Sequence, residues 1–185
     1  MIWQYLSIDS TTINNKNCIE LEKHLPVNKN RKGVKISAIV DDHGAPLTFT
    51  VVESTIHDSV IAIDNINDMA KSPIIKKAFE KTQGHLYLLG DKGYDSKKIR
   101  ENIEKLNMKS VIAPNNRNTR DPRKLRSLTK REERIYKKRL SVEHFFGIIK
   151  RRVKVNCIYE KKIASYNGLL MMLFGSILLN RTLKG

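Results

Sequence analysis

Two segments near the start of the sequence alternate hydrophobic and polar residues, with a turn between them. Val34–Val40 alternates and then becomes apolar, and a second such run covers Pro46–Glu53. Between them, Asp42-His43-Gly44 favours a tight turn, so this stretch predicts a β-hairpin. A shorter aromatic and β-branched run, Ile2–Ile8, predicts another strand, which ends at Asp9. Together the three strands predict an antiparallel unit.

The middle of the chain alternates between helical periodicity and short apolar runs. Asp58 is suited to cap a helix that extends to about Met69. Further elements follow at the spacing of βα units. They are helices at Lys71–Lys81 and from Asp95 or Ser96 to about Leu106, a buried strand at His85–Gly90, and a short strand at Ser110–Ala113. Asp91 therefore comes directly after a buried strand.

Two longer helices are predicted in the last third of the chain. One extends from Thr129 to about Arg152, and the other covers Ile163–Leu179. The second is apolar on nearly all sides, which predicts that it is buried. The order βββαβαβα with one extra helix is that of an RNase H-like α/β domain, with three antiparallel strands, then parallel strands, in a mixed sheet flanked by helices. We expect residues 1–185 to form one such domain.

Positive charge is concentrated in one quarter of the sequence. The chain carries 35 Lys and Arg against 19 Asp and Glu, a net charge of +16. Between Arg117 and Lys162 lie 17 of the basic and 5 of the acidic residues, which leaves 18 and 14 for the rest. A basic run can be only a solvated surface, and high net charge would also suit a ribosome or an acidic membrane. The concentration favours a segment that contacts nucleic-acid phosphates.

Several other classes of protein are disfavoured. Cys18 and Cys157 have no second Cys or His at zinc-ligand spacing beside them. The longest apolar run, Gly168–Leu179, has 12 residues, which is too short to span a bilayer. No basic region precedes the first apolar residues, as it would in a signal peptide. We therefore expect a soluble cytoplasmic protein, associated with the nucleoid and not with a membrane.

Three carboxylates stand where this fold would bring them together. Asp9 ends the first strand, Asp91 follows the fourth, and Glu143 lies within the long helix. Sites in open sheets form beyond strand ends, and converging carboxylates repel one another unless cations neutralise them. Oxygen ligands suit Mg²⁺ or Mn²⁺, and two such ions can activate a water or a 3′-hydroxyl and stabilise a leaving oxygen. Taken singly, the three are more simply a turn residue, a strand-end cap and a surface acid.

One side of the long helix places a carboxylate between cations. At ~100° per residue, an arc of about 60° contains Tyr136, Arg139, Glu143 and Lys150. An adjoining apolar stripe would anchor the helix to the sheet, and it consists of Val142, Phe146 and Ile149. The simpler explanation is an Arg139–Glu143 pair within the helix, worth only ~0.3–0.5 kcal/mol. That explanation does not account for Tyr136 or Lys150.

The spacing Tyr136-x2-Arg139-x3-Glu143-x6-Lys150 resembles the YREK signature of DDE transposases of bacterial insertion sequences, families four and five. The segments around the other two carboxylates resemble the family's motifs as well. They are Asp9-Ser10-Thr11 and Gly90-Asp91-Lys92-Gly93-Tyr94-Asp95-Ser96, with Gly44-x-Pro46-Leu47 and His57-Asp58-Ser59 as further landmarks between them. The separation of 52 positions between Asp91 and Glu143 is similar to that in family five.

The resemblance implies an RNase H-like catalytic domain that cleaves and joins DNA at the ends of an insertion sequence. Asp9, Asp91 and Glu143 would be the catalytic triad and would hold two divalent ions, Mg²⁺ or Mn²⁺. Residues expected to contact DNA are Tyr136, Arg139, Lys150, Arg151 and Arg152. The expected partners are the element ends, the target DNA and a second copy of the chain, as a homodimer in a transpososome.

The chain departs from this family in one respect. Family members usually have a helical DNA-binding region before the first aspartate, whereas eight residues precede Asp9 here. We therefore expect an N-terminal DNA-binding domain to be absent. Two functions stay open, a metal-dependent enzyme and a transposase remnant that binds DNA or a partner without cutting it. For a third, a basic structural protein of the ribosomal type, the carboxylates and the helix stripe would be coincidence.

Overall fold

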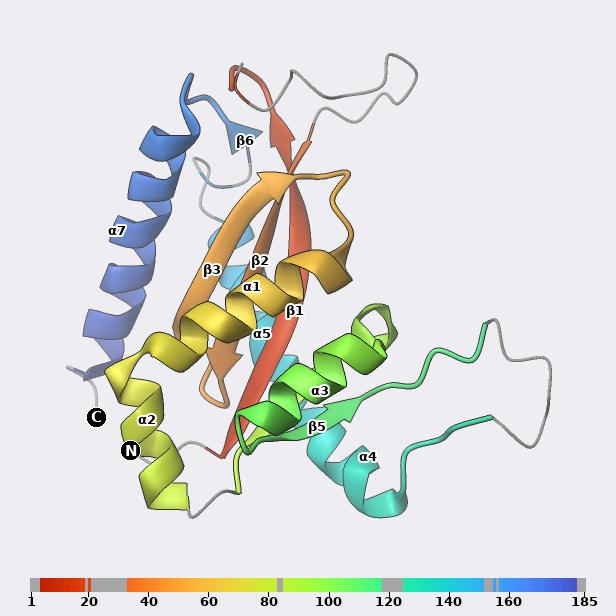
Figure 1. Ribbon diagram of the computed structural model, residues 1–185. Helices are drawn as coiled ribbons and strands as arrows, with labels where there is room; N and C mark the ends of the chain where they lie inside the picture. The colour runs from red at the N-terminus through yellow and green to blue at the C-terminus, as the bar shows by residue number, and fades with distance from the viewer. Residues whose placement is uncertain are drawn as a thin grey trace.

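A single mixed β-sheet forms the centre of the molecule (Figure 1). The computed structural model describes residues 4–18, 20, 33–82, 85–117, 125–151, 155 and 157–182. Its strands are β1 (Tyr5–Asn15), β2 (Gly33–Asp41), β3 (Pro46–Glu53), β4 (Tyr87–Gly90), β5 (Lys109–Ile112) and β6 (Cys157–Ile158). The order is β3-β2-β1-β4-β5, and the short β6, which was not predicted, pairs with β1. β1, β2 and β3 are antiparallel, whereas β4 and β5 run parallel to β1, which confirms the predicted fold.

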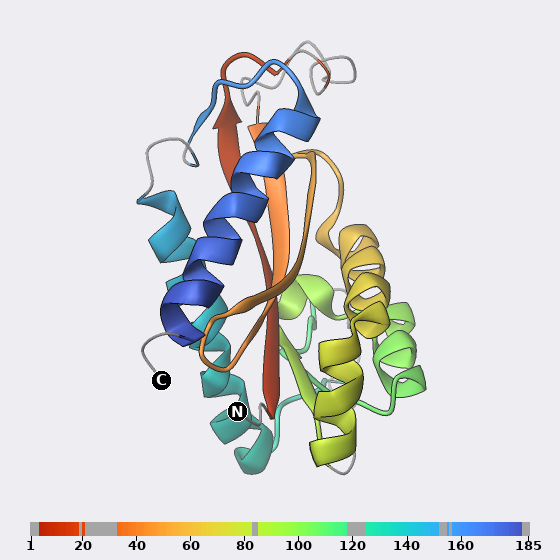
Figure 2. The same ribbon diagram turned by 90° about the vertical axis from the view of Figure 1, so that its left-hand side faces the viewer.

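Helices cover both faces of the sheet. They are α1 (Asp58–Lys71), α2 (Pro73–Thr82), α3 (Lys97–Lys105), α4 (Lys130–Tyr136), α5 (Leu140–Lys150) and α7 (Ile163–Thr182), with 3₁₀ turns η2 (Lys92–Tyr94) and η4 (Lys137–Arg139). Figure 2 shows α1, α2 and α3 on one side of the sheet and α5 and α7 on the other. Two separate apolar clusters lie beneath these two layers. The sheet therefore has a buried face on each side, as expected for this class of fold.

The predicted hairpin forms because its turn supplies the required backbone and hydrogen bonds. Gly44 adopts a φ of 74°, a left-handed conformation that glycine takes without strain. The carboxylate of Asp41 accepts hydrogen bonds from the backbone N–H groups of His43 (2.9 Å) and Ala45 (2.7 Å). β2 and β3 then pair from Val34↔Glu53 onward. Local turn chemistry is thus sufficient to explain this part of the sheet.

The first strand is longer than predicted, and Asp9 lies inside it rather than at its end. β1 continues well past Asp9 because it pairs with β2 from Leu6↔Asp41 to Asn14↔Gly33, and its last residue, Asn15, pairs with β6. On its other edge the pairing with β4 covers only Tyr5–Ser7. Asp9 therefore lies just past the point where β1 loses its parallel neighbour.

Helix α1 starts with a different cap from the one predicted. His57 is the N-cap residue, with an extended backbone, and its Nδ1 accepts from the backbone N–H of Ser59 at 3.3 Å. Asp58 is instead the first helical residue. Its carboxylate is engaged by Ser10 and Lys35 and so does not act as the cap.

The single long helix predicted from Thr129 to Arg152 is interrupted. Its start is correct, because Thr129 and Glu132 form a capping box at the head of α4. After Tyr136, however, the 3₁₀ turn η4 separates α4 from α5. The two halves pack against different parts of the sheet: α4 lies on β4 and β5, and α5 lies on β1 and β2. Because the strands of a sheet are twisted relative to one another, one straight helix would not follow both.

Helix α7 was predicted to be buried, and only one side of it is. Tyr166, Leu170 and Phe174 are buried, and Phe174 contacts Phe49 and Phe145 at ring-centroid distances of 4.8 and 5.2 Å. Its opposite side is exposed at Met171, Met172 and Leu179, by 63–77%. The window Ile163–Asn180, with a mean hydropathy of 1.4, is long and apolar enough to cross a membrane, contrary to the sequence expectation, and 17% of it is buried. The Phe174 contacts show that this helix is docked on the core of the domain.

Candidate active site

Asp9 and Asp91 are neighbours at the point where β1 and β4 separate. The parallel register pairs Ser7 with Leu89, so each aspartate stands two positions beyond the last pair and on the same face of the sheet. Burial raises the pKa of Asp9 above its ordinary value of 3.8, and the negative charge of Asp91 raises it further. The backbone N–H of Ser10 and the guanidinium of Arg139 act in the opposite direction. The two predicted carboxylates are therefore close enough to repel each other.

Asp91 also has a local structural role. Its Oδ1 accepts from the backbone N–H of Gly93 at 2.7 Å and so caps η2. A Cβ at residue 93 would lie 3.0 Å from that oxygen, which explains why a glycine suits this position. The interpretation of Asp91 as a strand-end cap is therefore correct, and it is compatible with a site role because only one carboxylate oxygen is used.

Arg139 connects the first and third predicted carboxylates. One guanidinium nitrogen donates to Oδ2 of Asp9 at 3.1 Å, and the other donates to Oε1 of Glu143. The guanidinium also lies 5.7 Å from the centre of the Tyr136 ring. The Arg139 side chain is only 17% exposed. The intrahelical Arg139–Glu143 pair is therefore present, but Arg139 reaches beyond it into the site.

Glu143 does not meet the two aspartates directly. Its side chain is 44% exposed and is turned toward Arg139, which lies between it and Asp9. Among the described residues, no group of three or more His, Cys, Asp or Glu side chains is close enough to hold one metal ion. A site for two divalent ions built from all three carboxylates therefore stays a prediction.

The donor chemistry of the Asp9–Asp91 pair nevertheless fits a divalent ion. Mg²⁺ is commonly bound by one or two carboxylates, with waters and substrate phosphates completing its coordination. Asp9 and Asp91 provide two hard-oxygen donors, and the electrostatic cost of placing them together is of the kind that a cation relieves. Glu143 could complete the set only if its carboxylate left Arg139.

The remaining residues predicted to contact DNA follow Glu143 along the helix. Lys150 is exposed and lies two turns after Glu143 in α5, so the two share one side of the helix. Arg151, just after the helix, donates from Nε to the backbone oxygen of Gly147 at 3.1 Å. Arg152 lies outside the described residues. The apolar stripe is as predicted, with Val142, Phe146 and Ile149 all buried, together with Phe145.

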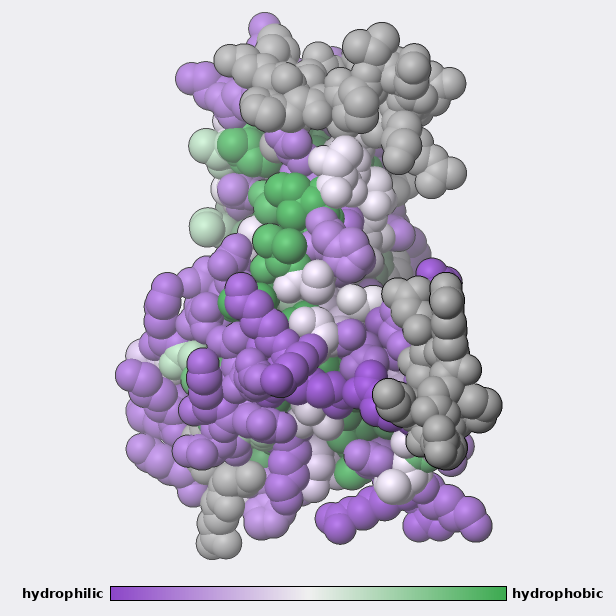
Figure 3. All heavy atoms as spheres, turned by 45° about the vertical axis from the view of Figure 1, so that its right-hand side comes forward, coloured by the Kyte–Doolittle hydropathy of each residue, from purple (hydrophilic) through white to green (hydrophobic). Residues whose placement is uncertain are grey.

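Exposed basic side chains also occur beside this site. Figure 3 shows hydrophilic side chains over the lower part of the face where Figure 1 places α3 and α4. The exposed cations of α4 and η4 are Lys130, Arg131, Arg134, Lys137 and Lys138. They occur within nine positions that also contain Glu132 and Glu133, and Arg139 directly follows the last of them.

Asp95 has a role that sequence reasoning missed. The sequence left Asp95 and Ser96 as alternative caps for this helix, and Ser96 is the N-cap of α3. The side chain of Asp95 is only 2% exposed and accepts from Arg100 (2.8 Å), from Arg126 and from the backbone N–H of Asn115 (2.7 Å). Burial favours a higher pKa, but these hydrogen bonds outweigh it and lower the pKa of Asp95. The aspartate thereby ties Asn115 and Arg126 to Arg100 of α3, a link of up to 31 positions that no local pattern reveals.

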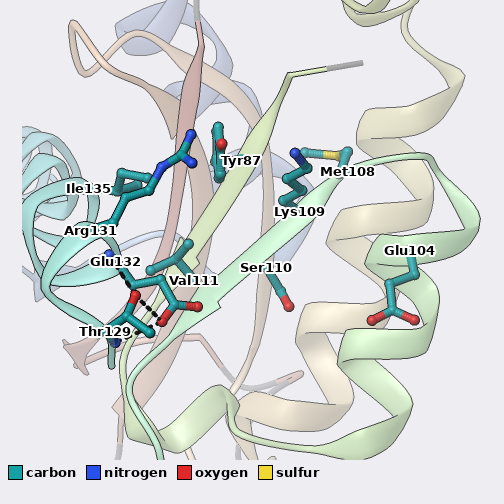
Figure 4. Close-up of a pocket in the computed structure, with 10 residues that line it drawn as sticks. All are labelled: Tyr87, Glu104, Met108, Lys109, Ser110, Val111, Thr129, Arg131, Glu132 and Ile135. Carbon is teal, nitrogen blue, oxygen red and sulfur yellow. Dashed lines mark hydrogen bonds between the residues drawn. The ribbon is translucent and has the colours of Figure 1, made fainter. Parts of the chain in front are cut away.

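A groove of about 470 Å³ lies away from the carboxylates. Figure 4 shows it between the first residues of β4 and β5 and helix α4, with Arg131 extending toward Tyr87 and Glu132 bonded to Thr129. Its lining includes none of the three predicted catalytic residues. Asp91, by contrast, follows the carboxyl end of β4, where sites in open α/β sheets form.

The fold and the paired aspartates together define a class, the RNase H-like catalytic domains. The family model described as "Transposase DDE domain" matches residues 4–179, and the chain belongs to this family. A comparison with curated proteins found no match.

Solved structures show the same fold. The catalytic domain of Mos1 mariner transposase is 11% identical, with a TM-score of 0.58 over 93% of this chain and 70% of that one. The Mos1 mariner paired end complex with Mn is 10% identical and has a TM-score of 0.52 over 95% of this chain. A piggyBac transposase synaptic complex with hairpin DNA is 11% identical and has a TM-score of 0.50, also over 95% of this chain. This chain spans 49% and 45% of those two proteins, so it is about half their length. Identities this low establish the fold alone.

Proposed function

We propose that this chain is the catalytic domain of an insertion-sequence transposase that cleaves and joins DNA by metal-dependent phosphoryl transfer. The observation that carries this proposal is the pairing of Asp9 with Asp91 where β1 and β4 separate. Membership of the DDE transposase family supports it. The assignment to family five within the insertion sequences rests on the YREK spacing and on the separation of Asp91 and Glu143.

Each residue of the site has a distinct task in this proposal. Asp9 and Asp91 would hold divalent ions, Mg²⁺ or Mn²⁺, and Glu143 would complete their coordination from α5. When bound, such ions supply the chemistry of activating a water or a 3′-hydroxyl and stabilising the leaving oxygen. Without bound ions, the single positive charge of Arg139 is shared between Asp9 and Glu143. A guanidinium that is released from these carboxylates is well suited to a DNA phosphate.

DNA would lie across the basic surface beside the site. Tyr136 is placed to stack on a base or to donate to a phosphate, and Lys150, Arg151 and Arg152 would neutralise the backbone further along. The paired-end and synaptic assemblies of the Mos1 and piggyBac proteins support a homodimer that holds two DNA ends. A protein with these partners would act at the nucleoid, in the cytoplasm.

A nicking assay on supercoiled duplex DNA tests the proposal. The chain should nick DNA with Mg²⁺ or Mn²⁺ and not with EDTA, and Asp91→Asn should be inactive. Asp68→Asn is the matched control, because Asp68 pairs with Lys71 on the surface of α1 and should nick normally. Binding of DNA without nicking, with no affinity for Mn²⁺, would favour the second candidate, a remnant that only binds. The observation that favours this second candidate is the position of Arg139 between Asp9 and Glu143, where it occupies carboxylate oxygens that a metal ion would need.

A further inference from the structure

Asp9 is connected to helix α1, on the opposite side of the sheet, through the residue that follows it. The backbone N–H of Ser10 donates to Oδ1 of Asp9 at 2.8 Å. The hydroxyl of Ser10 donates to Oδ1 of Asp58 at 2.7 Å. Successive residues of a strand point to opposite faces, so Ser10 holds the Asp9 carboxylate with its backbone and reaches α1 with its side chain.

Asp58 is itself held firmly. Nζ of Lys35 lies 3.0 Å from Oδ1 of Asp58 and donates to the backbone oxygen of Ile56 at 2.6 Å. The Lys35 side chain is 12% exposed and that of Asp58 is 32% exposed, so this charge pair is partly shielded from water. Asp58 also stands in the first turn of α1, where the helix dipole favours a negative charge. The carboxylate is therefore a rigid acceptor for Ser10.

A second polar residue of α1 reaches the same part of the sheet. Asn65 lies two turns after Asp58, on the same side of the helix, and is fully buried. Its amide donates to the hydroxyl of Ser37 at 2.8 Å, and it accepts from Thr50. Ser37 is the cross-strand partner of Ser10, and its hydroxyl is 3.5 Å from the backbone oxygen of Asp9. Burying a polar group is costly unless it forms hydrogen bonds. The hydrogen bonds of Asn65 and Ser37 lead to the segment of β1 that contains Asp9.

We propose that Asp58 is a positioning residue for Asp9 and that it acts through Ser10. Two donors orient the carboxylate of Asp9: the Ser10 backbone N–H holds Oδ1 and Arg139 holds Oδ2. When a divalent ion takes the place of Arg139, the Ser10 N–H is the donor that stays. Asp58 fixes Ser10 and therefore fixes that donor. This assigns a task to Asp58 of the His57-Asp58-Ser59 segment, which the proposed chemistry does not otherwise use. The inference rests on the proposed function, because positioning matters only if Asp9 binds an ion.

Mn²⁺ binding, measured by calorimetry beside thermal unfolding, tests this inference. Groups that orient a metal ligand typically change metal affinity by about 10–100-fold when removed. Asp58→Ala and Ser10→Ala should each weaken Mn²⁺ binding by about tenfold. The double variant should bind Mn²⁺ no more weakly than either single variant, because each single change already breaks the same Ser10–Asp58 link. Asp58→Asn keeps an oxygen that accepts from Ser10 and should retain most of the affinity, and Asp68→Ala should leave it unchanged.

The possible outcomes separate the two proposals. A lower unfolding temperature for Asp58→Ala with unchanged Mn²⁺ affinity would show that Asp58 only supports the fold, and would overturn the inference. Additive losses in the double variant would overturn the route through Ser10. If Asp58→Ala does not fold, Ser10→Ala and Asp58→Asn give the same decision. Failure of the unaltered chain to bind Mn²⁺ would overturn the proposed function, and the positioning role with it.

Discussion

The guanidinium of Arg139 donates a hydrogen bond of 3.1 Å to Asp9, across 130 positions of sequence. This contact fastens the turn between α4 and α5 to the middle of β1. The same guanidinium binds Glu143, so two of the three predicted catalytic carboxylates share one cation. Arg139 is therefore a structural link, and divalent ions would have to compete with it for the carboxylates of Asp9 and Glu143.

Replacement of Arg139 by alanine should destabilise the protein, because it leaves Asp9 partly buried without a counter-charge. Hydrogen bonds to charged groups contribute about 1.5–3 kcal/mol, and partial exposure places the expected loss at the lower end. Chemical unfolding would measure it. Arg134→Ala, at an exposed position of α4, should change stability by less than about 0.5 kcal/mol. Equal effects of the two variants would contradict the assigned role.

Asp9→Asn should abolish cleavage without lowering stability at neutral pH. The pKa of Asp9 is raised in the folded protein, so the folded state binds its proton more tightly than the unfolded state does. The charge therefore costs stability as the pH rises above about 3.8, the ordinary pKa. Thermal unfolding should show the Asp9→Asn variant gaining stability relative to the unaltered protein as the pH rises from about 4 to about 7. A constant difference over that range would contradict the raised pKa.

Glu143→Gln should abolish strand cleavage while DNA binding survives. The change keeps the shape of the side chain but removes the charge needed to hold a metal ion, and it also removes repulsion from phosphates. Cleavage and binding would be measured on the same preparation. Glu133→Gln, at an exposed position of α4, is the control and should cleave normally. Normal cleavage by Glu143→Gln would exclude Glu143 from the catalytic set.

Lys150→Ala should weaken DNA binding in a salt-dependent way. One lost phosphate contact lowers the log–log salt slope by about one unit. Mn²⁺ affinity should stay unchanged, because Lys150 lies two turns from Glu143. Binding isotherms at several salt concentrations would show this. Lys71→Ala, at the end of α1, should leave the slope unaltered, and an equal drop there would indicate general charge attraction.

The two sides of α7 should respond very differently to truncation. Phe174 packs against Phe49 and Phe145, and its replacement by alanine should cost about 3–5 kcal/mol of stability. Met172 is 77% exposed, and Met172→Ala should change stability by less than about 0.5 kcal/mol. Denaturant midpoints would measure both. A large loss of stability in Met172→Ala would show that the Met172 side of the helix is covered in solution.

The sequence by itself determined the elements that depend on near neighbours. The hairpin follows from alternation and from the Asp41–Gly44 turn, and the start of α4 follows from the Thr129–Glu132 capping box. Asp91 could be placed after a buried strand for the same reason. These patterns depend on interactions between residues a few positions apart, so they can be recognised without knowledge of the fold.

Only the tertiary structure decided features that depend on distant partners. β1 passes through Asp9 because β2 pairs with it from Leu6 to Asn14. The predicted long helix breaks at η4 because its halves rest on different strands, and α7 is exposed on one side because the sheet can cover only the other. The links from Arg139 to Asp9 and from Asp58 to Ser10 span 130 and 48 positions. Such contacts leave no periodic pattern in the chain, because packing in three dimensions selects them.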